Sequence, residues 1–304
     1  MSEASPPDFD GELRAAAVSW LDQVSALGSQ TVTRDQLAAF EYAGTRRPLM
    51  AVQQGIWKPR DLTAALSIRT AFTRPGAAPP YLDAEGPDGL LRYKWRGTDP
   101  QHYENVALRT AMRERRPLLW FVGIARGVYL PRYPVWLVAE EPADHQFVVA
   151  VDQGQRVVGG PVVDAAQRSY LERLTRLRLH QPVFRSRVLF AYEKQCSVCR
   201  LRHVALLDAA HIVPDSDPDG LPVVPNGLAM CKIHHAAYDA NLIGIRPDLT
   251  VDVRADILAE IDGPMLRHGL QEMRDVKLLL PRARDARPDT ARLERRYRQF
   301  RLAG

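Results

Sequence analysis

Four residues in the second half of the chain have the types and spacing of zinc ligands. Cys196 and Cys199 form a CxxC pair, and Cys231 and His234 repeat the same two-residue gap. Two short turns of this kind deliver four ligands to a tetrahedral Zn²⁺, and three thiolates with one imidazole leave no coordination position open. The pattern therefore predicts a structural zinc site that uses all 3 cysteines of the chain. The alternative is that the cysteines are small buried apolar residues and His234 a surface side chain.

Three further polar residues lie between and beside these ligands. His211 ends a strand-like segment, Asn226 lies in the loop before the second knuckle, and His235 directly follows the proposed ligand His234. This pattern resembles the signature of the HNH endonucleases of the ββα-metal superfamily. That signature has a histidine at a strand end, an asparagine in a loop and a histidine on a helix, often held together by two CxxC-type metal-binding turns, called knuckles. The resemblance covers roughly residues 184–248 and includes the turn at Pro214.

This resemblance implies hydrolysis of phosphodiester bonds. His211 would be the general base, because an imidazole with a reference pKa of about 6.5 is largely neutral at cellular pH. By analogy with the family, Asn226 would shape the loop and orient His211, or reach the metal. His235 would help to hold a divalent catalytic ion, Mg²⁺ or Mn²⁺. Adjacent helical residues point about 100° apart, so His234 can face the zinc while His235 faces the cleft.

The sequence departs from the family pattern at one position. Many members carry an aspartate metal ligand directly before the base, and this chain has Ala210 there. Either Asp208, two residues before Ala210 on the same strand, or Asp239, one helical turn after His235, would then complete the ion site, or water would do so. Each acid also has an ordinary structural interpretation, Asp208 as a strand-end acid and Asp239 as a cap or an ion-pair partner.

The first half of the chain is predicted to decide where the nuclease acts. Segments 55–68, 81–97 and 102–112 resemble the N-terminal region of HNH restriction endonucleases of the modification-dependent (type IV) class. That resemblance implies a module that reads modified double-stranded DNA, related to the SRA-like domains that flip a modified cytosine such as 5-methylcytosine into a pocket.

Aromatic and basic residues interleave in these segments, as they do on surfaces that stack on bases and contact phosphates. The candidate DNA-binding residues are Trp57, Tyr81, Asp83, Tyr93, Trp95 and Arg96. The aspartate could accept a hydrogen bond from a cytosine amino group, or it could cap a turn. The alternative for the aromatic residues is that they pack inward from a strand.

Hydrophobic periodicity predicts the elements that must position these residues. Helices are expected over 11–27, after a capping residue at Thr33, and over 103–116. Strands are expected over 90–95, 118–125, 134–140 and 146–152, with a Gly- and Pro-rich loop over 74–89. The fold class is α+β: an N-terminal mixed, barrel-like domain with a mostly antiparallel sheet, SRA-like by resemblance, and a C-terminal ββα-metal HNH domain with a structural zinc.

The predicted domain boundaries follow from these elements. Residues 1–155 form the modified-DNA recognition domain, 156–183 a charged helical linker, and 184–304 the HNH endonuclease domain with C-terminal helices. The final helical pattern, around residues 291–300, is rich in arginine and is interpreted as a surface helix docked by a narrow apolar stripe.

Composition limits the class of protein. The chain has 304 residues, 25% charged residues and a net charge of +5, and no apolar run approaches the length of a membrane span. The first residues lack the pattern of an export signal, and 3 cysteines are too few for a disulfide framework, so a cytoplasmic location is expected. Clustered arginines suggest a polyanionic partner.

Two functional interpretations follow. The first is a two-domain, modification-dependent DNA endonuclease that hydrolyses phosphodiester bonds with a one-metal HNH site. The second is a zinc-containing DNA-binding protein without cleavage activity, which the alanine at position 210 makes conceivable. Both a monomer and a homodimer that cuts both strands are compatible with the sequence.

Overall fold

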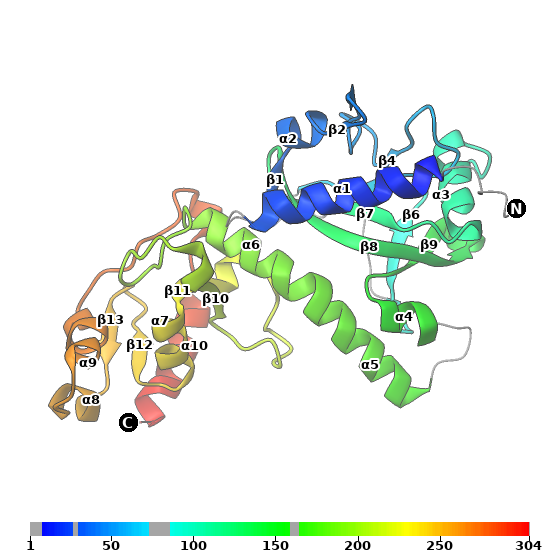
Figure 1. Cartoon of the computed structure of the whole chain (residues 1–304). Helices are drawn as coiled ribbons and strands as arrows, with labels where there is room; N and C mark the ends of the chain where they lie inside the picture. Colours follow the sequence, from blue (N-terminus) through cyan, green and yellow to red (C-terminus); the bar gives the residue numbers. More distant parts are fainter. Residues whose placement is uncertain (1–7, 27–29, 73–85, 159–163, 304) are drawn as a thin grey trace, which may run out of the picture. The chain divides into compact units, whose positions relative to one another are not determined.

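The computed structural model describes residues 8–26, 30–72, 86–158 and 164–303 (Figure 1). The chain divides into two compact units, Met1–Val183 and Phe184–Gly304. Within the described ranges, no helix is both long enough and apolar enough to cross a membrane. Most of the predicted loop over 74–89 falls outside the described residues, and so do Tyr81 and Asp83.

The N-terminal unit is built on a 7-stranded sheet. Its strands are β1 (Val32–Thr33), β4 (Ile56–Trp57), β5 (Ser67–Thr70), β6 (Leu91–Lys94), β7 (Leu118–Ala125), β8 (Val128–Glu141) and β9 (Gln146–Ala150). They lie in the order β4-β5-β7-β8-β9-β6, and β1 pairs with β8. Only β5 and β7 run parallel among the paired strands of this sheet in the described ranges. The predicted α+β fold with a mostly antiparallel sheet is therefore confirmed.

The long strand β8 makes this sheet curl into a half-barrel. Its first part pairs with β7 and its second part with β9, so one strand belongs to both walls. Register shifts interrupt both ladders, between Leu118 and Trp120 on β7 and between Leu137 and Ala139 on β8. Such irregularities bend a strand and increase its twist, which is how a sheet turns a corner.

Two cores cover the two faces of β7, which explains why this strand is apolar at every position. Leu118 and Trp120 pack with helix α3 (Tyr103–Arg113) in one core, whereas Leu119 and Phe121 pack with helix α1 (Phe9–Ala26) in the other. Successive side chains of a strand point to opposite faces. A strand that is buried on both sides is therefore apolar throughout instead of alternating.

The helices of this unit begin close to the predicted positions. The remaining ones are α2 (Arg34–Ala38), α4 (Gln153–Val158) and α5 (Ala165–Thr175), with a small hairpin of β2 (Glu41–Tyr42) and β3 (Thr45–Arg46) and the 3₁₀ turn η1 (Pro142–Asp144). Thr33 caps α2 by accepting from the Gln36 N–H, and the Gln36 side chain accepts from the Thr33 N–H, so the predicted capping box is confirmed.

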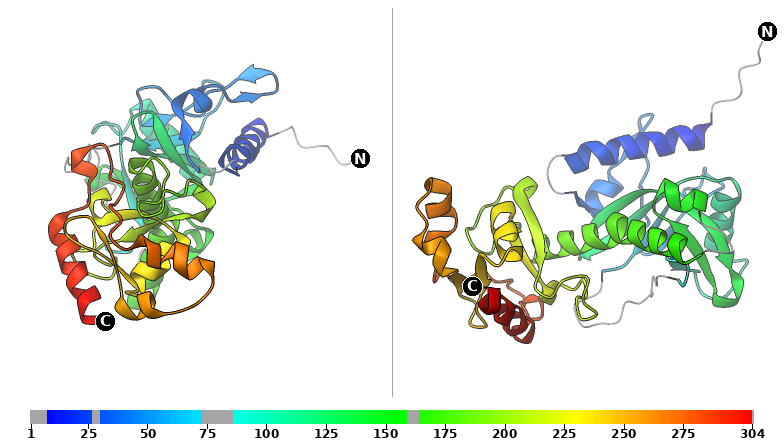
Figure 2. Two further views of the ribbon diagram at one scale, coloured as in Figure 1. Left: turned by 90° about the vertical axis from the view of Figure 1, so that its left-hand side faces the viewer. Right: turned by 90° about the horizontal axis from the view of Figure 1, so that it is seen from below.

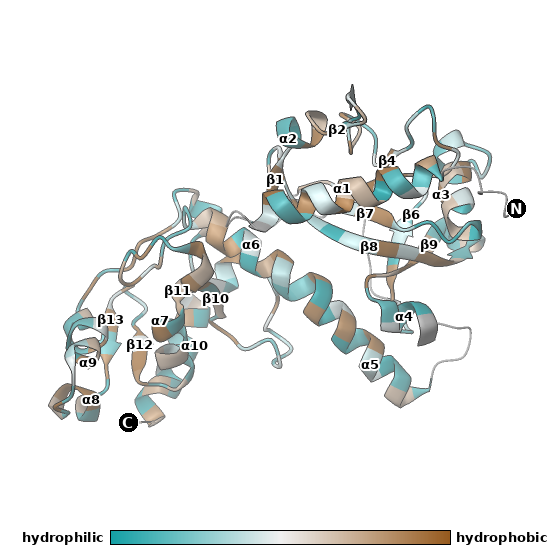
Figure 3. Ribbon diagram, viewed as in Figure 1, coloured by the Kyte–Doolittle hydropathy of each residue, from teal (hydrophilic) through white to brown (hydrophobic). Residues whose placement is uncertain are grey.

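Three helical segments lie around the point where the chain divides into its two units. Helix α5, the π-helical turn η2 (Arg176–His180) and helix α6 (Gln181–Ala191) follow one another directly, as Figure 2 shows in green. The division between the units falls inside α6. Figure 3 shows hydrophilic (teal) and hydrophobic (brown) residues mixed along these helices.

The C-terminal unit contains a ββα arrangement. An antiparallel hairpin of β10 (Leu207–His211) and β11 (Gly227–Cys231) leads directly into helix α7 (Lys232–Asp239). The other elements are η3 (Val204–Leu206), η4 (Val224–Asn226), β12 (Ile243–Ile245), β13 (Val251–Val253), α8 (Ala255–Ala259), α9 (Pro264–Gly269), η5 (Gln271–Met273), η6 (Arg284–Ala286) and α10 (Thr290–Ala303). Helix α6 and the hairpin share one core with these elements.

The C-terminal helix α10 docks through the predicted apolar stripe and through one residue that the sequence did not suggest. Leu293 and Phe300 are buried, but so is Arg296. The Arg296 guanidinium lies 4.6 Å from the centre of the Tyr238 ring and donates to the backbone carbonyl of Tyr238 at 2.5 Å. This arginine therefore anchors α10 to the end of α7 and does not belong to the solvent-exposed basic surface.

Candidate active site and metal cluster

The two predicted ligand pairs, Cys196 with Cys199 and Cys231 with His234, come together as expected. Ligand atoms of Cys196, Cys199, Cys231 and His234 all lie within 4.8 Å of one another. His234 Nδ1 lies 3.1 Å from the Cys231 sulfur and 3.5 Å from the Cys196 sulfur. On the other side of the ring, Nε2 lies 2.8 Å from the backbone carbonyl of Gly269. A proton on Nε2 would satisfy that carbonyl and leave the Nδ1 lone pair facing the thiols, which is the arrangement of a metal-ligating histidine.

Local structure explains how these ligands come together. Cys196 and Cys199 lie in the turn after α6, and the backbone N–H of Ser197 donates to the carbonyl of Ala229 on β11 at 2.6 Å. Cys231 ends β11 and caps α7, so His234 follows in the first helical turn. Three thiols and an imidazole this close together form the donor set of a structural zinc site.

His211 lies at the end of β10 against an aromatic ring of α6. Its imidazole stacks on Phe184, with ring centres 4.0 Å apart and an angle of 19° between the planes. Burial lowers the pKa of His211 below its ordinary value. His211 Nε2 is buried and has no hydrogen-bond partner among the described residues. The imidazole is thus half-buried and packed against α6.

Asn226 is fully buried and holds the loop that follows His211. Its side-chain oxygen accepts from the Val213 N–H at 2.9 Å, and its amide nitrogen donates to the carbonyls of Val213 at 3.0 Å and Leu221 at 3.1 Å. The Asn226 backbone carbonyl also accepts from the Ile212 N–H at 2.9 Å. Of the two roles suggested by the resemblance, these contacts favour shaping the loop, because the amide is already occupied by backbone groups.

We expect Asn226→Ala to lower the free energy of unfolding of the C-terminal unit by about 1–3 kcal/mol, because it leaves buried backbone groups of Val213 without partners. Chemical denaturation followed by circular dichroism measures the change. Leu221→Ala is the matched control, since it truncates an exposed side chain in the same loop and keeps the backbone carbonyl. Equal stability of the two variants would contradict the prediction.

His235 lies between two carboxylates, and both of the acids considered as ligands are beside it. His235 Nδ1 is 3.4 Å from an Asp208 oxygen, and Nε2 is 3.2 Å from an Asp239 oxygen. Hydrogen bonds to Asp208 and Asp239 raise the pKa of His235 to about 9. The ring is therefore protonated near neutral pH. Arg185 Nε lies 3.5 Å from the other oxygen of Asp208.

Ala210 has no access to this cluster. It is fully buried in the core of the C-terminal unit, between the partly exposed Asp208 and His211 on the same strand. Besides burial, the charges of Asp215, His235, Asp239 and Asp208 act on the pKa of His211, which places these residues in one neighbourhood. His211, His235, Asp208 and Asp239 thus lie close together, although the residue at position 210 is an alanine and not an aspartate.

Two of the three candidate DNA-binding aromatic residues that the structure describes are core residues, which corrects the prediction for these two. Tyr93 is 6% exposed and Trp95 is 5% exposed, and both pack in the core beside α3. The Tyr93 hydroxyl donates to the Gly55 carbonyl at 2.9 Å. Trp57 is partly buried, and its indole N–H donates to the Pro48 carbonyl at 2.7 Å. The inward side chains of β6 and its neighbours are occupied by packing, so they offer no stacking surface.

The basic residues beside them differ in exposure. Arg92 is buried and pairs with Asp88 at 2.8 Å and Glu141 at 2.7 Å, so its charge is neutralised within the unit. Arg96 is exposed. Of the proposed DNA contacts that the structure describes, only Arg96 is exposed, and Trp57 is partly exposed.

The sequence did not indicate a role for Phe184 or Arg185. Both lie on α6, well before His211 in the chain, and reach the site only because α6 packs against the β10–β11 hairpin. No local spacing connects them to the motif, so no sequence signal could have identified them.

Residues 196–246 match the model of a family described as HNH endonuclease. The matched segment contains the metal cluster, His211, Asn226 and His235. The C-terminal unit thus carries an HNH endonuclease domain, and the chain is a nuclease that hydrolyses DNA phosphodiester bonds.

Among solved structures, the chain is similar to one described as a modification-dependent TagI restriction endonuclease. The two share 19% sequence identity with a TM-score of 0.29, and the alignment covers 90% of this chain and 92% of the other. The comparison with curated proteins gave no match.

Proposed function

We propose that this protein is a modification-dependent (type IV) restriction endonuclease. In this proposal the N-terminal unit recognises double-stranded DNA that carries a modified cytosine, such as 5-methylcytosine, and the C-terminal unit cuts it. The observation that carries the nuclease part is the grouping of His211, His235, Asp208 and Asp239 beside the Cys₃His cluster. The recognition part is supported by the resemblance of segments 55–68, 81–97 and 102–112 to N-terminal regions of type IV enzymes.

The proposed chemistry assigns one task to each group. His211 accepts the proton of the attacking water, because burial keeps its imidazole neutral at lower pH than usual. Phe184 holds the plane of the ring, and Asn226 holds the loop behind it. His235, Asp208 and Asp239 would bind Mg²⁺ or Mn²⁺. When bound, that ion would neutralise charge on the scissile phosphate and on the leaving oxygen.

The test uses the full chain with plasmids that differ only in cytosine modification. In the presence of Mg²⁺ or Mn²⁺, we expect cleavage of the modified plasmid and intact unmodified plasmid. Cleavage of both plasmids would remove the recognition part of the proposal and leave a general HNH nuclease. Binding of DNA without cleavage of either plasmid would instead favour the zinc-containing DNA-binding protein.

Phe184 provides a separate test of the role of His211. In Phe184→Ala, water reaches the imidazole, so the pKa of His211 should rise towards about 6.5. Because the neutral ring is the active base, the acidic limb of the pH–rate profile should move to higher pH, and cleavage near pH 6 should fall more than cleavage near pH 8. Initial cleavage rates between pH 5 and 9 measure the shift.

The matched control is Phe190→Ala, an exposed phenylalanine on the same helix. It should leave the pH–rate profile unchanged. An unshifted profile in Phe184→Ala, with cleavage merely slower at all pH values, would mean that Phe184 has only a packing role.

A further inference from the structure

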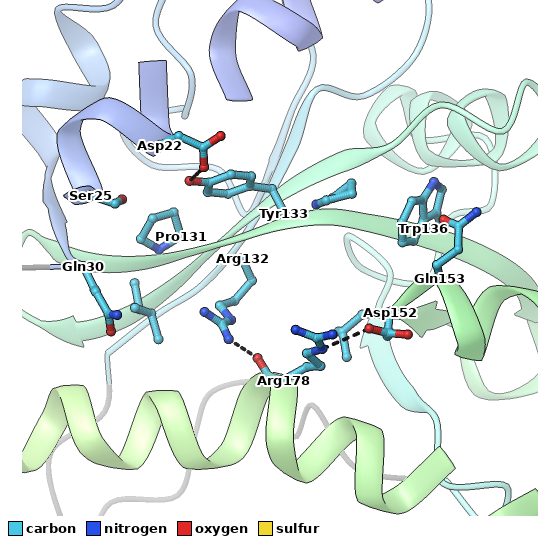
Figure 4. A pocket seen from close by; sticks show the side chains of 13 residues that line it. Asp22, Ser25, Gln30, Pro131, Arg132, Tyr133, Trp136, Asp152, Gln153 and Arg178 are labelled. Carbon is cyan, nitrogen blue, oxygen red and sulfur yellow. Dashed lines mark hydrogen bonds and ion pairs between the residues drawn. The ribbon is translucent and has the colours of Figure 1, made fainter. Parts of the chain in front are cut away.

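The N-terminal unit contains a pocket that is lined by none of the predicted DNA contacts within the described part of the chain. Its volume is about 550 Å³, within the range of about 300–1,000 Å³ typical of ligand sites. Residues from α1, from β8, from the segment after β9 and from η2 surround it (Figure 4). The side chains that matter for ligand chemistry are Asp22, Arg132, Tyr133, Trp136, Asp152 and Arg178.

Arg132 is the cation of this pocket whose charge is left uncompensated. Its guanidinium donates to the backbone carbonyl of Arg178, as the dashed line in Figure 4 shows, and no carboxylate of the described residues pairs with it. Burial lowers the pKa of Arg132, and the neighbouring charge of Arg178 lowers it further. A partly buried guanidinium beside a second cation has a strong electrostatic requirement for an anion.

The two acids of the pocket are engaged elsewhere. Asp152 pairs with Arg178 Nε at 2.9 Å, and Asp22 accepts a hydrogen bond from the Tyr133 hydroxyl at 2.9 Å. Burial and the Asp22 hydrogen bond raise the pKa of Tyr133 to about 12, so the phenol stays neutral. Asp152 compensates Arg178, and Asp22 orients the ring of Tyr133, so neither acid occupies the space in front of Arg132.

The wall beside Arg132 is formed by rings of β8, Pro131 and the partly exposed Tyr133. Trp136 also lines the pocket, but it is 8% exposed and the Arg156 guanidinium lies over its ring, 5.3 Å from the ring centre. The amide of Gln153 adds hydrogen-bonding groups at the rim. A ligand that fits this lining has an anionic group at one end and a flat or apolar part beside it, which describes one nucleotide unit of a nucleic acid strand.

We propose that this pocket binds a backbone phosphodiester of the DNA, with Arg132 as the main ligand of the anion and the Tyr133 ring against the attached nucleoside. The inference rests on the proposed function, because it takes DNA as the ligand of the N-terminal unit. In this proposal the DNA contact lies on β8 and not on the buried aromatic residues of β6. A phosphate contact of this kind positions the duplex and is the same for modified and plain DNA.

The test measures DNA affinity of the full chain against salt concentration, without added Mg²⁺ or Mn²⁺. Arg132→Gln should lower the affinity for modified and plain duplexes by the same factor, about fivefold to tenfold near 0.1 M salt. The slope of log K against log salt should become shallower by about 0.9, the value for one lost phosphate contact. Arg132→Lys keeps the charge and should retain most of the slope.

Arg126→Gln is the matched control, since it removes one positive charge from an exposed arginine on the turn before β8, outside the pocket. It should leave the slope nearly unchanged. If Arg132→Gln does not fold, Arg178→Gln tests the same pocket at a side chain that is 61% exposed. That variant should shift affinity and slope in the same direction.

The inference is overturned if the Arg132 and Arg178 variants keep the wild-type slope and affinity, or if Arg126→Gln loses as much affinity. A loss confined to the modified duplex would also overturn it, because the pocket would then contact the modified base and not the backbone. Failure of the proposed function has a different signature: the wild-type protein would not discriminate between modified and unmodified plasmids, whatever the effect of Arg132→Gln on the slope.

Discussion

His211→Ala is expected to reduce the rate of DNA cleavage by about 10²–10⁴-fold, the usual contribution of a general base. The variant removes the imidazole that accepts the proton of water, while His235, Asp208 and Asp239 remain to bind the ion. DNA affinity measured without a divalent ion should change little. Single-turnover cleavage of a modified duplex measures the rate directly, free of product release.

The matched control is His203→Ala, which removes an exposed histidine of the same unit. It should cleave at nearly the wild-type rate. Because the His211 ring packs on Phe184, thermal unfolding of both variants must be compared as well. Cleavage by folded His211→Ala within tenfold of wild type would exclude His211 as the base.

The same residue should make stability depend on pH. Folding lowers the pKa of His211, so below about pH 6.5 the unfolded chain binds a proton that the folded chain resists. The contribution of His211 to stability is therefore complete above pH 6.5 and is lost as pH falls towards the lower, folded pKa. His211→Ala should flatten the stability profile between pH 5 and 7, which urea denaturation at several pH values would reveal.

Removal of zinc is expected to unfold the C-terminal unit. Elemental analysis should find one zinc per chain, and Cys231→Ser should lose the metal together with the structure of this unit. Zinc binding to sites of this donor set provides about 10–16 kcal/mol, which is comparable to the whole free energy of unfolding of a typical domain, about 5–15 kcal/mol. Strong chelators should therefore act as denaturants of this unit.

Ser197→Ala is the control for the cluster. Ser197 lies between two ligands and is buried, but its hydroxyl has no hydrogen-bond partner among the described residues. Its removal should preserve both zinc content and fold. All 5 tryptophans lie before residue 137, so tryptophan fluorescence reports on the N-terminal unit while circular dichroism and proteolysis report on the other. Purified protein without zinc, or folded Cys231→Ser, would contradict the prediction.

Features that depend on a few neighbouring residues could be predicted from the sequence alone. The capping box of Thr33 and Gln36, the knuckle of Cys231 and His234, and the strand over 118–125 all formed as expected. In each case the backbone geometry of one turn or one strand already determines where the side chains go. The knuckle spacing also identified both halves of the metal cluster, since each half is a local turn.

Contacts between distant segments were decided only by the tertiary structure. The stacking of His211 on Phe184 and the position of His235 between Asp208 and Asp239 require α6, the hairpin and α7 to pack in one particular way. Likewise, the sequence pattern of the aromatic residues of β6 fits either a DNA-binding surface or a hydrophobic core. In the structure these residues pack with α3 in the core. Hydrophobic burial is not directional, so a periodic pattern specifies which residues can be buried, whereas the partner that buries them depends on the whole fold.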